Sequence, residues 1–163
     1  MTMKQLTNLK TSIIIIFLLF SNNSQAQNIK TAYFAGGCFW CMEESFDKID
    51  GVVSTISGYS GGHLKNPTYE DVVYTDSGHV EAIEITYKPK VVSYKKLLEI
   101  YWQNIDPFDA NGQFCDKGKS YRSVIFFENK LQKNLIDHSF KKYEKAFNKK
   151  IVTLIWKFDK FYP

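Results

Sequence analysis

The sequence predicts an α+β fold: a ferredoxin-like split βαβ core, in which a mixed sheet is covered by helices and connected by long irregular loops. The first observation is the order of the predicted elements, which is strand, helix, strand, strand, helix, strand, followed by an added helix and strand. The second is composition. Hydrophobic residues make up 44% of the 163 residues and aromatic residues 16%, which excludes a disordered chain and suffices for one domain with its own core.

The first predicted strand and helix meet at two glycines. Residues 31–35 form a short β-type run that ends at Gly36 and Gly37. Residues 39–49 carry an approximate apolar stripe at helical spacing, and Gly51 is typical of a helix stop. The sequence therefore predicts a strand, a sharp turn and then a helix.

Two further strands flank a glycine-rich loop. Residues 52–57 have strand character and lead into the loop 58–63, after which Thr68 is placed to cap a short helical turn. Residues 80–87 form the next predicted strand, which Pro89 closes.

The second half of the chain holds the clearest helix. Residues 93–102 begin with a serine cap, and their apolar residues recur at i, i+3, i+4, i+7 and i+8, which gives one face for a core. The irregular stretch 104–120 follows, and a loop of that length in a compact domain indicates a functional segment. A predicted strand at 121–127, a charged helix at 129–147 and a last strand at 151–158 complete the chain.

The N-terminal segment has the features of a secretory signal peptide. Lys4 and Lys10 precede the apolar run 13–20, which is much shorter than the ~20 residues of a membrane-spanning helix. A small-x-small cleavage signal ends at Ala26. We therefore expect a signal peptide at 1–26 and one domain at 27–163, exported to the periplasm or another extracytoplasmic compartment. A retained N-terminal anchor is the alternative.

The charge gives little support for a nucleic-acid partner. The formal net charge is +4, and Lys4 and Lys10 supply two of these charges, so the mature part is only weakly basic. The lysine-rich stretch 130–150 fits a solvated helix face. We expect a monomer without a nucleic-acid partner.

The three cysteines favour redox chemistry over a structural disulfide framework, because an odd number leaves at least one thiol unpaired. Cys38 follows the two glycines at the start of the predicted helix, where free N–H groups and the helix dipole stabilise a thiolate. Cys41 lies three residues further on, and a modest shift would allow a disulfide between them. The alternative is a buried, inert Cys38. Cys115 lies in the irregular stretch.

Aromatic and acidic side chains suit a substrate pocket near Cys38. Phe39 and Trp40 directly follow it and can form an apolar wall for a methyl or thioether group, although either ring fits a core equally well. Glu81 lies on an otherwise apolar strand face, so burial should raise its pKa and suit it to donate a proton. The alternative is a strand-end glutamate that reaches water.

Two other functions fit parts of this pattern. A thioredoxin-like dithiol oxidoreductase also uses a C-x-x-C pair, but here both middle residues are aromatic and the strand order differs. A non-catalytic zinc module would use Cys38, Cys41 and one of His63 or His79, but this spacing matches no closed zinc pattern. We therefore expect no bound metal.

Seven short blocks occur along the chain: Gly37-Cys38-Phe39-Trp40, Gly58-Tyr59-Ser60-Gly61-Gly62-His63, Asn66-Pro67-Thr68-Tyr69, Gly78-His79-Val80-Glu81, Asn104-Ile105-Asp106-Pro107-Phe108-Asp109, Gln113-Phe114-Cys115-Asp116 and Tyr121-Arg122-Ser123. In this order they resemble the A-type methionine sulfoxide reductase family, from about Tyr33 to the end of the chain. The resemblance implies a peptide-methionine (S)-S-oxide reductase that acts on the S-sulfoxide of methionine, with both the protein-bound and the free form open as substrates.

The resemblance also implies the roles of the site residues. Cys38 attacks the sulfoxide sulfur and becomes a sulfenic acid. The other implied residues are the acid Glu81, the hydroxyl donors Tyr69 and Tyr121, the carboxylate Asp116, and the S-methyl pocket of Phe39 and Trp40. The donors must converge on the sulfoxide oxygen, because negative charge develops there.

A second thiol must convert the sulfenic acid to a disulfide. Many members of the family use cysteines in a C-terminal tail, and the family pattern would normally run on past Pro163, so we expect either a truncated chain or an absent tail. Cys41 is the favoured resolving thiol because of its helical spacing, and Cys115, next to Asp116, is the alternative. The family implies no bound cofactor and an external dithiol reductant of thioredoxin type.

Overall fold

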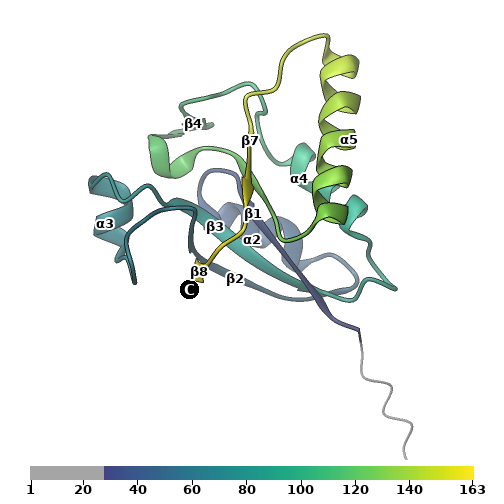
Figure 1. The fold of residues 1–163 in the computed structure, drawn as a ribbon, viewed down its shortest axis with the longest axis horizontal. Helices are drawn as coiled ribbons and strands as arrows, with labels where there is room; N and C mark the ends of the chain where they lie inside the picture. The colour runs from purple at the N-terminus through teal and green to yellow at the C-terminus, as the bar shows by residue number, and fades with distance from the viewer. Residues whose placement is uncertain (1–27) are drawn as a thin grey trace, which may run out of the picture.

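Among residues 28–163, which the computed structural model describes, a six-stranded sheet lies at the centre of the fold (Figure 1). Its strands in spatial order are β7 (Leu154–Lys157), β6 (Val124–Phe127), β1 (Lys30–Ala35), β3 (Val80–Tyr87), β2 (Val52–Ser60) and β8 (Phe161–Tyr162). Neighbouring strands are antiparallel except β6 and β7, which are parallel. The predicted α+β class with a mixed sheet is confirmed.

Helices pack against this sheet, and a small hairpin lies beside it. The elements are α2 (Phe39–Asp47), α3 (Tyr69–Tyr74), α4 (Tyr94–Gln103), the 3₁₀ helix η1 (Lys119–Tyr121), α5 (Lys130–Phe147) and the hairpin of β4 (Gly112–Gln113) and β5 (Asp116–Lys117). Ser93 caps α4 by accepting the N–H of Lys96, as its sequence predicts.

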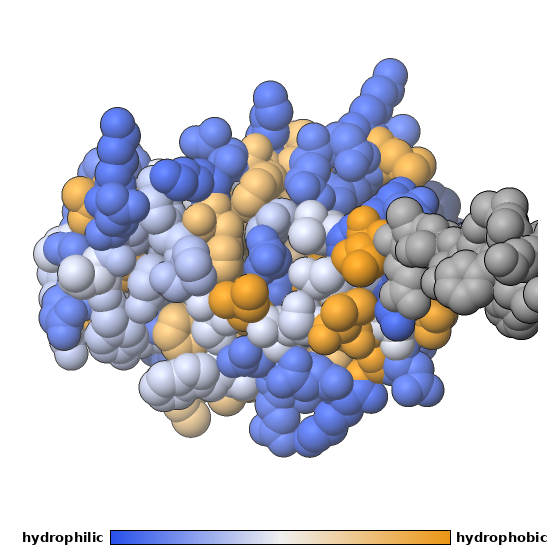
Figure 2. Space-filling model, turned by 90° about the horizontal axis from the view of Figure 1, so that it is seen from below, coloured by the Kyte–Doolittle hydropathy of each residue, from blue (hydrophilic) through white to orange (hydrophobic). Residues whose placement is uncertain are grey.

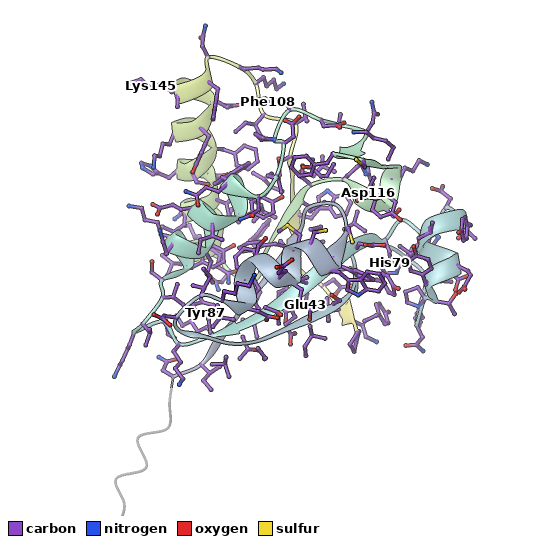
Figure 3. All side chains as sticks on the ribbon, turned by 180° about the vertical axis from the view of Figure 1, so that it is seen from behind. Glu43, His79, Tyr87, Phe108, Asp116 and Lys145 are labelled. Carbon is purple, nitrogen blue, oxygen red and sulfur yellow. The ribbon has the colours of Figure 1, made fainter. Side chains whose placement is uncertain are left out.

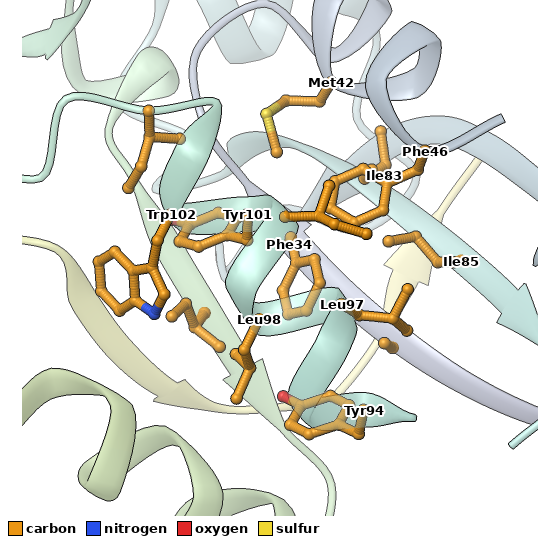
Figure 4. Close-up of a cluster of buried hydrophobic side chains, with 14 of the residues drawn as sticks. Phe34, Met42, Phe46, Ile83, Ile85, Tyr94, Leu97, Leu98, Tyr101 and Trp102 are labelled. Atoms are coloured by element: carbon orange, nitrogen blue, oxygen red, sulfur yellow. The ribbon is translucent and has the colours of Figure 1, made fainter. Parts of the chain in front are cut away.

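The main core lies between one face of the sheet and helices α2, α4 and α5 (Figure 4). The predicted apolar face of α4 is buried, and its Tyr101 ring packs 5.0 Å from the ring of Phe34 in β1. The Tyr101 hydroxyl donates to the carbonyl of Ala35 at 2.9 Å, so this buried phenol is satisfied. The contact fixes the end of β1, which leads into the glycine turn before α2.

The chain after β7 covers part of the other face of the sheet. Tyr33 of β1 stacks on Phe158 with ring centroids 3.8 Å apart, and Phe126 meets Trp156 edge-on at 5.9 Å. The chain then reaches the far edge, where β8 pairs with β2. Another face of the molecule, seen in Figure 2, carries separate hydrophobic patches among polar side chains.

Several element bounds differ from those predicted from sequence. Strand β2 continues through Ser60, into the predicted glycine-rich loop, because Tyr59 and Ser60 pair with β8. The sequence analysis did not predict β8. Tyr121 ends a 3₁₀ turn closed by its N–H to the Gly118 carbonyl at 3.1 Å, so the strand predicted from 121 begins at Val124.

The irregular stretch 104–120 contains the β4–β5 hairpin, and the last predicted strand is shorter than 151–158. The predicted signal peptide at 1–26 lies outside the described residues. Within the described part of the chain, no helix has the length and apolar character that crossing a membrane requires.

Candidate active site

Cys38 stands at the first position of helix α2, where the sequence predicts it. It is the N-cap residue, its carbonyl accepts the N–H of Met42 at 3.2 Å, and its side chain makes no capping hydrogen bond. Cys38 is partly exposed, and its thiol is free. The alternative of a buried Cys38 is therefore wrong. The positive end of a helix favours a negatively charged group at this position.

Gly37 and Gln113 hold the turn before Cys38. Gly37 has φ +85°, and an added Cβ would lie 2.7 Å from Cβ of Gln113, so only glycine fits. The buried Gln113 side chain accepts the N–H of Asp106 at 2.6 Å and donates to the Asp106 carbonyl at 2.9 Å. Gln113 thus ties the β4–β5 hairpin to the backbone at Asp106 and packs it against the turn before Cys38. From sequence alone, Gln113 has no predicted role.

Glu81 is joined directly to the start of α2. Its Oε2 accepts the backbone N–H of Phe39 at 3.0 Å, and the residue is 2% exposed. Burial raises the pKa of the Glu81 carboxyl, the Phe39 N–H opposes this shift, and the charge of Asp116 adds to it. The predicted buried acid is present, and the alternative of a glutamate that reaches water is wrong.

The two tyrosines and the second acid gather around Glu81. The pKa of Tyr121 is raised by burial, then by its interaction with the Tyr69 hydroxyl, and further by Glu81 and Asp116. Tyr69 reaches this group from the start of α3, after the capping box of Thr68 and Asp71. Residues from α3, β3, β5 and η1 therefore converge near the start of α2. Figure 3 shows Asp116 and His79 toward one end of the molecule and Tyr87 toward the other.

A cleft of about 450 Å³ brings the three cysteines together. Cys38, Cys41 and Cys115 all line it, and Cys41 and Cys115 are exposed. Burial raises the pKa of the Cys41 thiol, and the neighbouring Cys38, then Asp116 and Glu44, raise it further. Cys115 lies at the tip of the β4–β5 hairpin, after Phe114 with φ +47°. The structure therefore places both candidate resolving thiols on the cleft that contains Cys38.

The aromatic pair after Cys38 divides between core and surface. Phe39 is 7% exposed and packs in the main core, whereas Trp40 is 69% exposed. Their ring centroids lie 5.5 Å apart at an interplanar angle of 45°. The pair therefore offers an inner and an outer aromatic surface next to the thiol.

His79 organises the loop that leads to Tyr69. The Gly62 N–H donates to its Nδ1 at 3.1 Å, so Nε2 carries the proton and donates to the Leu64 carbonyl at 2.8 Å. Both ring nitrogens are thus engaged by backbone groups. Across residues 28–163, no group of three or more His, Cys, Asp or Glu side chains is arranged to hold a metal ion. These contacts give His79 a structural role, which the sequence analysis missed.

Comparison with known proteins gives one consistent result. The family model described as peptide methionine sulfoxide reductase matches residues 30–163. A peptide methionine sulfoxide reductase MsrA of Bacillus velezensis is 50% identical over 80% of this chain and 75% of its own length. The reduced form of Mxr1 from Saccharomyces cerevisiae has a TM-score of 0.76 at 28% identity, over 86% of this chain and 82% of its own. Mxr1 in complex with Trx2 has a TM-score of 0.61 at 22% identity, over 88% and 86%.

Proposed function

The chain belongs to the peptide methionine sulfoxide reductase family, and we propose that Cys38 is the sulfur that carries out the family's reaction. The protein is a peptide-methionine (S)-S-oxide reductase, which converts methionine S-sulfoxide to methionine. The observation that carries the assignment to Cys38 is the hydrogen bond from Phe39 to Glu81, because it ties a buried acid to the helix that begins at the thiol.

In the proposed first step, the Cys38 sulfur attacks the sulfoxide sulfur while Glu81 donates a proton to the sulfoxide oxygen. Tyr69 and Tyr121 donate hydrogen bonds to that oxygen, and Asp116 keeps the group of donors organised. This attack forms a bond between the two sulfur atoms, and the S–O bond of the substrate breaks as the protonated oxygen leaves as water. The water oxygen then bonds to the Cys38 sulfur and loses a proton, the sulfur–sulfur bond breaks with its electron pair on the substrate sulfur, and the methionine thioether is released while Cys38 is left as a sulfenic acid. The raised pKa of Glu81 suits the donor role, because the carboxyl holds its proton at higher pH.

We propose that the S-methyl group of the substrate lies against Phe39 and Trp40. These rings directly follow the nucleophile, and the exposed Trp40 presents an apolar surface to solvent. An aromatic surface favours a methyl group next to sulfur over a charged side chain.

The sulfenic acid is resolved by Cys41. Its thiolate attacks the Cys38 sulfur, a disulfide forms, and the oxygen leaves as water. The proximity of Cys38, which contributes to the raised pKa of Cys41, supports this assignment over Cys115. Cys115 lines the same cleft and is the alternative.

An external dithiol of thioredoxin type then reduces the disulfide. The fold that this chain shares with Mxr1, which has been solved in complex with Trx2, supports such a partner. The exposed position of Cys41 allows a partner thiolate to attack it.

A single-turnover assay tests this function. Reduced protein is mixed with a peptide that contains the S or the R epimer of methionine sulfoxide, without reductant, and the methionine formed is quantified. We expect about one equivalent from the S epimer and none from the R epimer. Cys38→Ser should abolish product, whereas Cys115→Ser, the matched control, should still form it. Turnover by Cys38→Ser would reject the assignment.

We also propose that β6, β1, β3 and β2 form a ferredoxin-like split βαβ core. Their order in the sheet, their antiparallel pairing and the positions of α2 and α4 in the chain support this description. An experimental structure with another order of these strands would contradict it.

Export is a further proposal, and its support comes from the sequence alone: the basic start, the apolar run 13–20 and the cleavage signal that ends at Ala26. Mass spectrometry of the protein from the extracytoplasmic fraction should find Gln27 at the N-terminus. A full-length cytoplasmic protein would contradict export.

We also propose that the protein is a monomer. Sedimentation velocity tests this proposal.

A further inference from the structure

Tyr59 lies next to the acid, yet the mechanism above gives it no role. The register of β2 and β3 pairs Tyr59 directly with Glu81, so the two side chains point to the same face of the sheet. Cβ atoms in such a pair lie ~4.5–5.5 Å apart. Ser57, on the same face of β2, donates to Glu43 of α2 at 2.9 Å, which shows that this face points toward α2.

The ring of Tyr59 also contacts the residue that holds the acid. Its centroid lies 5.9 Å from that of Phe39, at an interplanar angle of 40°. Phe39 is therefore held in two ways: its ring contacts the rings of Tyr59 and Trp40, and its backbone N–H is bonded to Glu81. A change in the position of the Phe39 ring would move that N–H and the start of α2 together.

The hydroxyl end of Tyr59 points into the same group of donors. Burial raises its pKa, and Glu81, Tyr69 and Glu70 raise it further. These effects are consistent with the register, which pairs Tyr59 with Glu81.

Strand β8 holds Tyr59 from the other side. Tyr59 pairs with Tyr162, and the neighbouring Ser60 hydroxyl donates to the Lys160 carbonyl at 2.8 Å. A Cβ on Gly58 would lie 2.3 Å from the Tyr162 carbonyl oxygen, so the two strands approach closely at this point. The backbone of Tyr59 is thus fixed between β3 and β8.

We propose that Tyr59 is a positioning residue for sulfoxide reduction: its ring clamps Phe39, so that the Phe39 N–H holds the Glu81 carboxyl beside Cys38. The inference rests on the proposed role of Glu81 as the acid. Sites that position reacting groups on rigid strands hold them more accurately than sites on loops, and a misplacement of ~1 Å costs about a hundredfold in rate. In this arrangement the ring of Tyr59 positions Phe39, and the hydroxyl contributes little to that position.

The experiment compares Tyr59→Phe, which keeps the ring, with Tyr59→Leu, which removes it. Phe140→Leu is the control, because the Phe140 ring on α5 packs edge-on against Trp102 of α4, away from the site. Single-turnover rates at saturating S-sulfoxide peptide are measured between pH 5 and pH 9, together with the apparent affinity for the peptide and the melting temperature.

We expect the single-turnover rate of Tyr59→Phe to stay within about twofold of the wild-type rate. The rate of Tyr59→Leu should fall by about tenfold to a hundredfold. The apparent affinity for the peptide should change less than about threefold, because the ring is not proposed to contact substrate. The alkaline fall in rate should move to lower pH in Tyr59→Leu, because Glu81 is then better hydrated, and this loss of burial outweighs any weakening of the Phe39 N–H bond, which acts in the opposite direction. Phe140→Leu should lower the melting temperature without changing the rate or its pH profile.

Two results would overturn the inference: a wild-type rate and pH profile in Tyr59→Leu, or an equal loss in Tyr59→Phe and Tyr59→Leu. Should Tyr59→Leu fail to fold, Tyr59→Met, which keeps most of the volume without a flat ring, takes its place with the same expectations. Glu81→Gln is measured in parallel. A normal rate in Glu81→Gln would reject the proposed acid, whereas a slow Glu81→Gln beside a normal Tyr59→Leu would reject only the role of Tyr59.

Discussion

The Oε2 atom of Glu81 accepts the backbone N–H of Phe39 at 3.0 Å, so the carboxyl on β3 is bonded to the first residue after Cys38. This N–H belongs to the first turn of α2, whose donors have no partner within the helix. The bond stabilises the charged carboxylate, while burial disfavours it, and burial is the larger effect. The acid is therefore both held in place and biased toward its protonated form.

Glu81→Gln should lower the single-turnover rate by about a hundredfold or more, because the amide keeps the shape and loses the transferable proton. The wild-type rate of sulfoxide reduction should fall as pH rises through the raised pKa of Glu81. The variant should lack that fall. Rapid-quench measurements from pH 5 to pH 9 test both points, and an unchanged profile in the variant would remove Glu81 from the acid role.

The same substitution should not destabilise the fold at alkaline pH. The pKa of Glu81 is higher in the folded protein than its ordinary value of 4.5, so the folded state binds more protons in the window just above that value. The contribution of Glu81 to the free energy of unfolding is therefore fully present below this pH window and is lost as pH rises through it. Since glutamine does not titrate, Glu81→Gln should melt no lower than the wild type at pH 8 in differential scanning calorimetry. A markedly lower melting temperature would contradict the desolvation argument.

Cys41→Ser should release one equivalent of methionine and then stop, with a sulfenic acid trapped on Cys38. Cys115→Ser should recycle normally with thioredoxin, because Cys38 contributes to the raised pKa of Cys41 and therefore lies near it. Mass spectrometry after a single turnover should find a disulfide between residues 38 and 41 in the wild type. The reverse behaviour of the two variants would assign the resolving role to Cys115.

Disulfide formation should have the opposite pH dependence to sulfoxide reduction. The attacking species is the Cys41 thiolate, and its pKa is raised by burial, by Cys38, by Asp116 and by Glu44. The rate of this step should therefore rise with pH through that raised value. Glu44→Gln removes one of the negative charges and should shift the rise to lower pH. Loss of the sulfenic acid, followed with a trapping reagent, measures the rate.

Much of the site could be predicted from local patterns, because glycines, helix starts and strand alternation act over a few residues. The glycine pair placed Cys38 at the start of α2, and the alternation of β3 placed Glu81 on the buried face. The missed contacts join distant segments. Tyr59 pairs with Tyr162, and Gln113 packs against Gly37, and no local preference encodes either contact.

Gly37→Ala should destabilise the protein by about 1–3 kcal/mol and also slow sulfoxide reduction. The residue has φ +85°, and its new Cβ would press on Gln113, which holds the hairpin that carries Cys115 and Asp116. Gly51→Ala is the matched control, because it has φ +95° and its Cβ would press on Val91, after the other end of α2. Both variants should have a lower melting temperature than the wild type. Only Gly37→Ala should reduce sulfoxide more slowly per folded molecule. An equal loss of activity in both would show a general effect of instability.

Tyr69→Phe and Tyr121→Phe should have non-additive effects on the rate. The two hydroxyls interact with each other, since Tyr69 contributes to the raised pKa of Tyr121, and both are proposed to donate to the same sulfoxide oxygen. Each single variant should lower the single-turnover rate about tenfold. The double variant should lower it by less than the product of the two single effects, because one remaining donor cannot keep the geometry of the pair. Tyr74→Phe, an exposed tyrosine at the end of α3, is the control and should match the wild type. A double-mutant cycle on single-turnover rates measures the coupling, and strictly multiplicative losses would show that the two hydroxyls act independently.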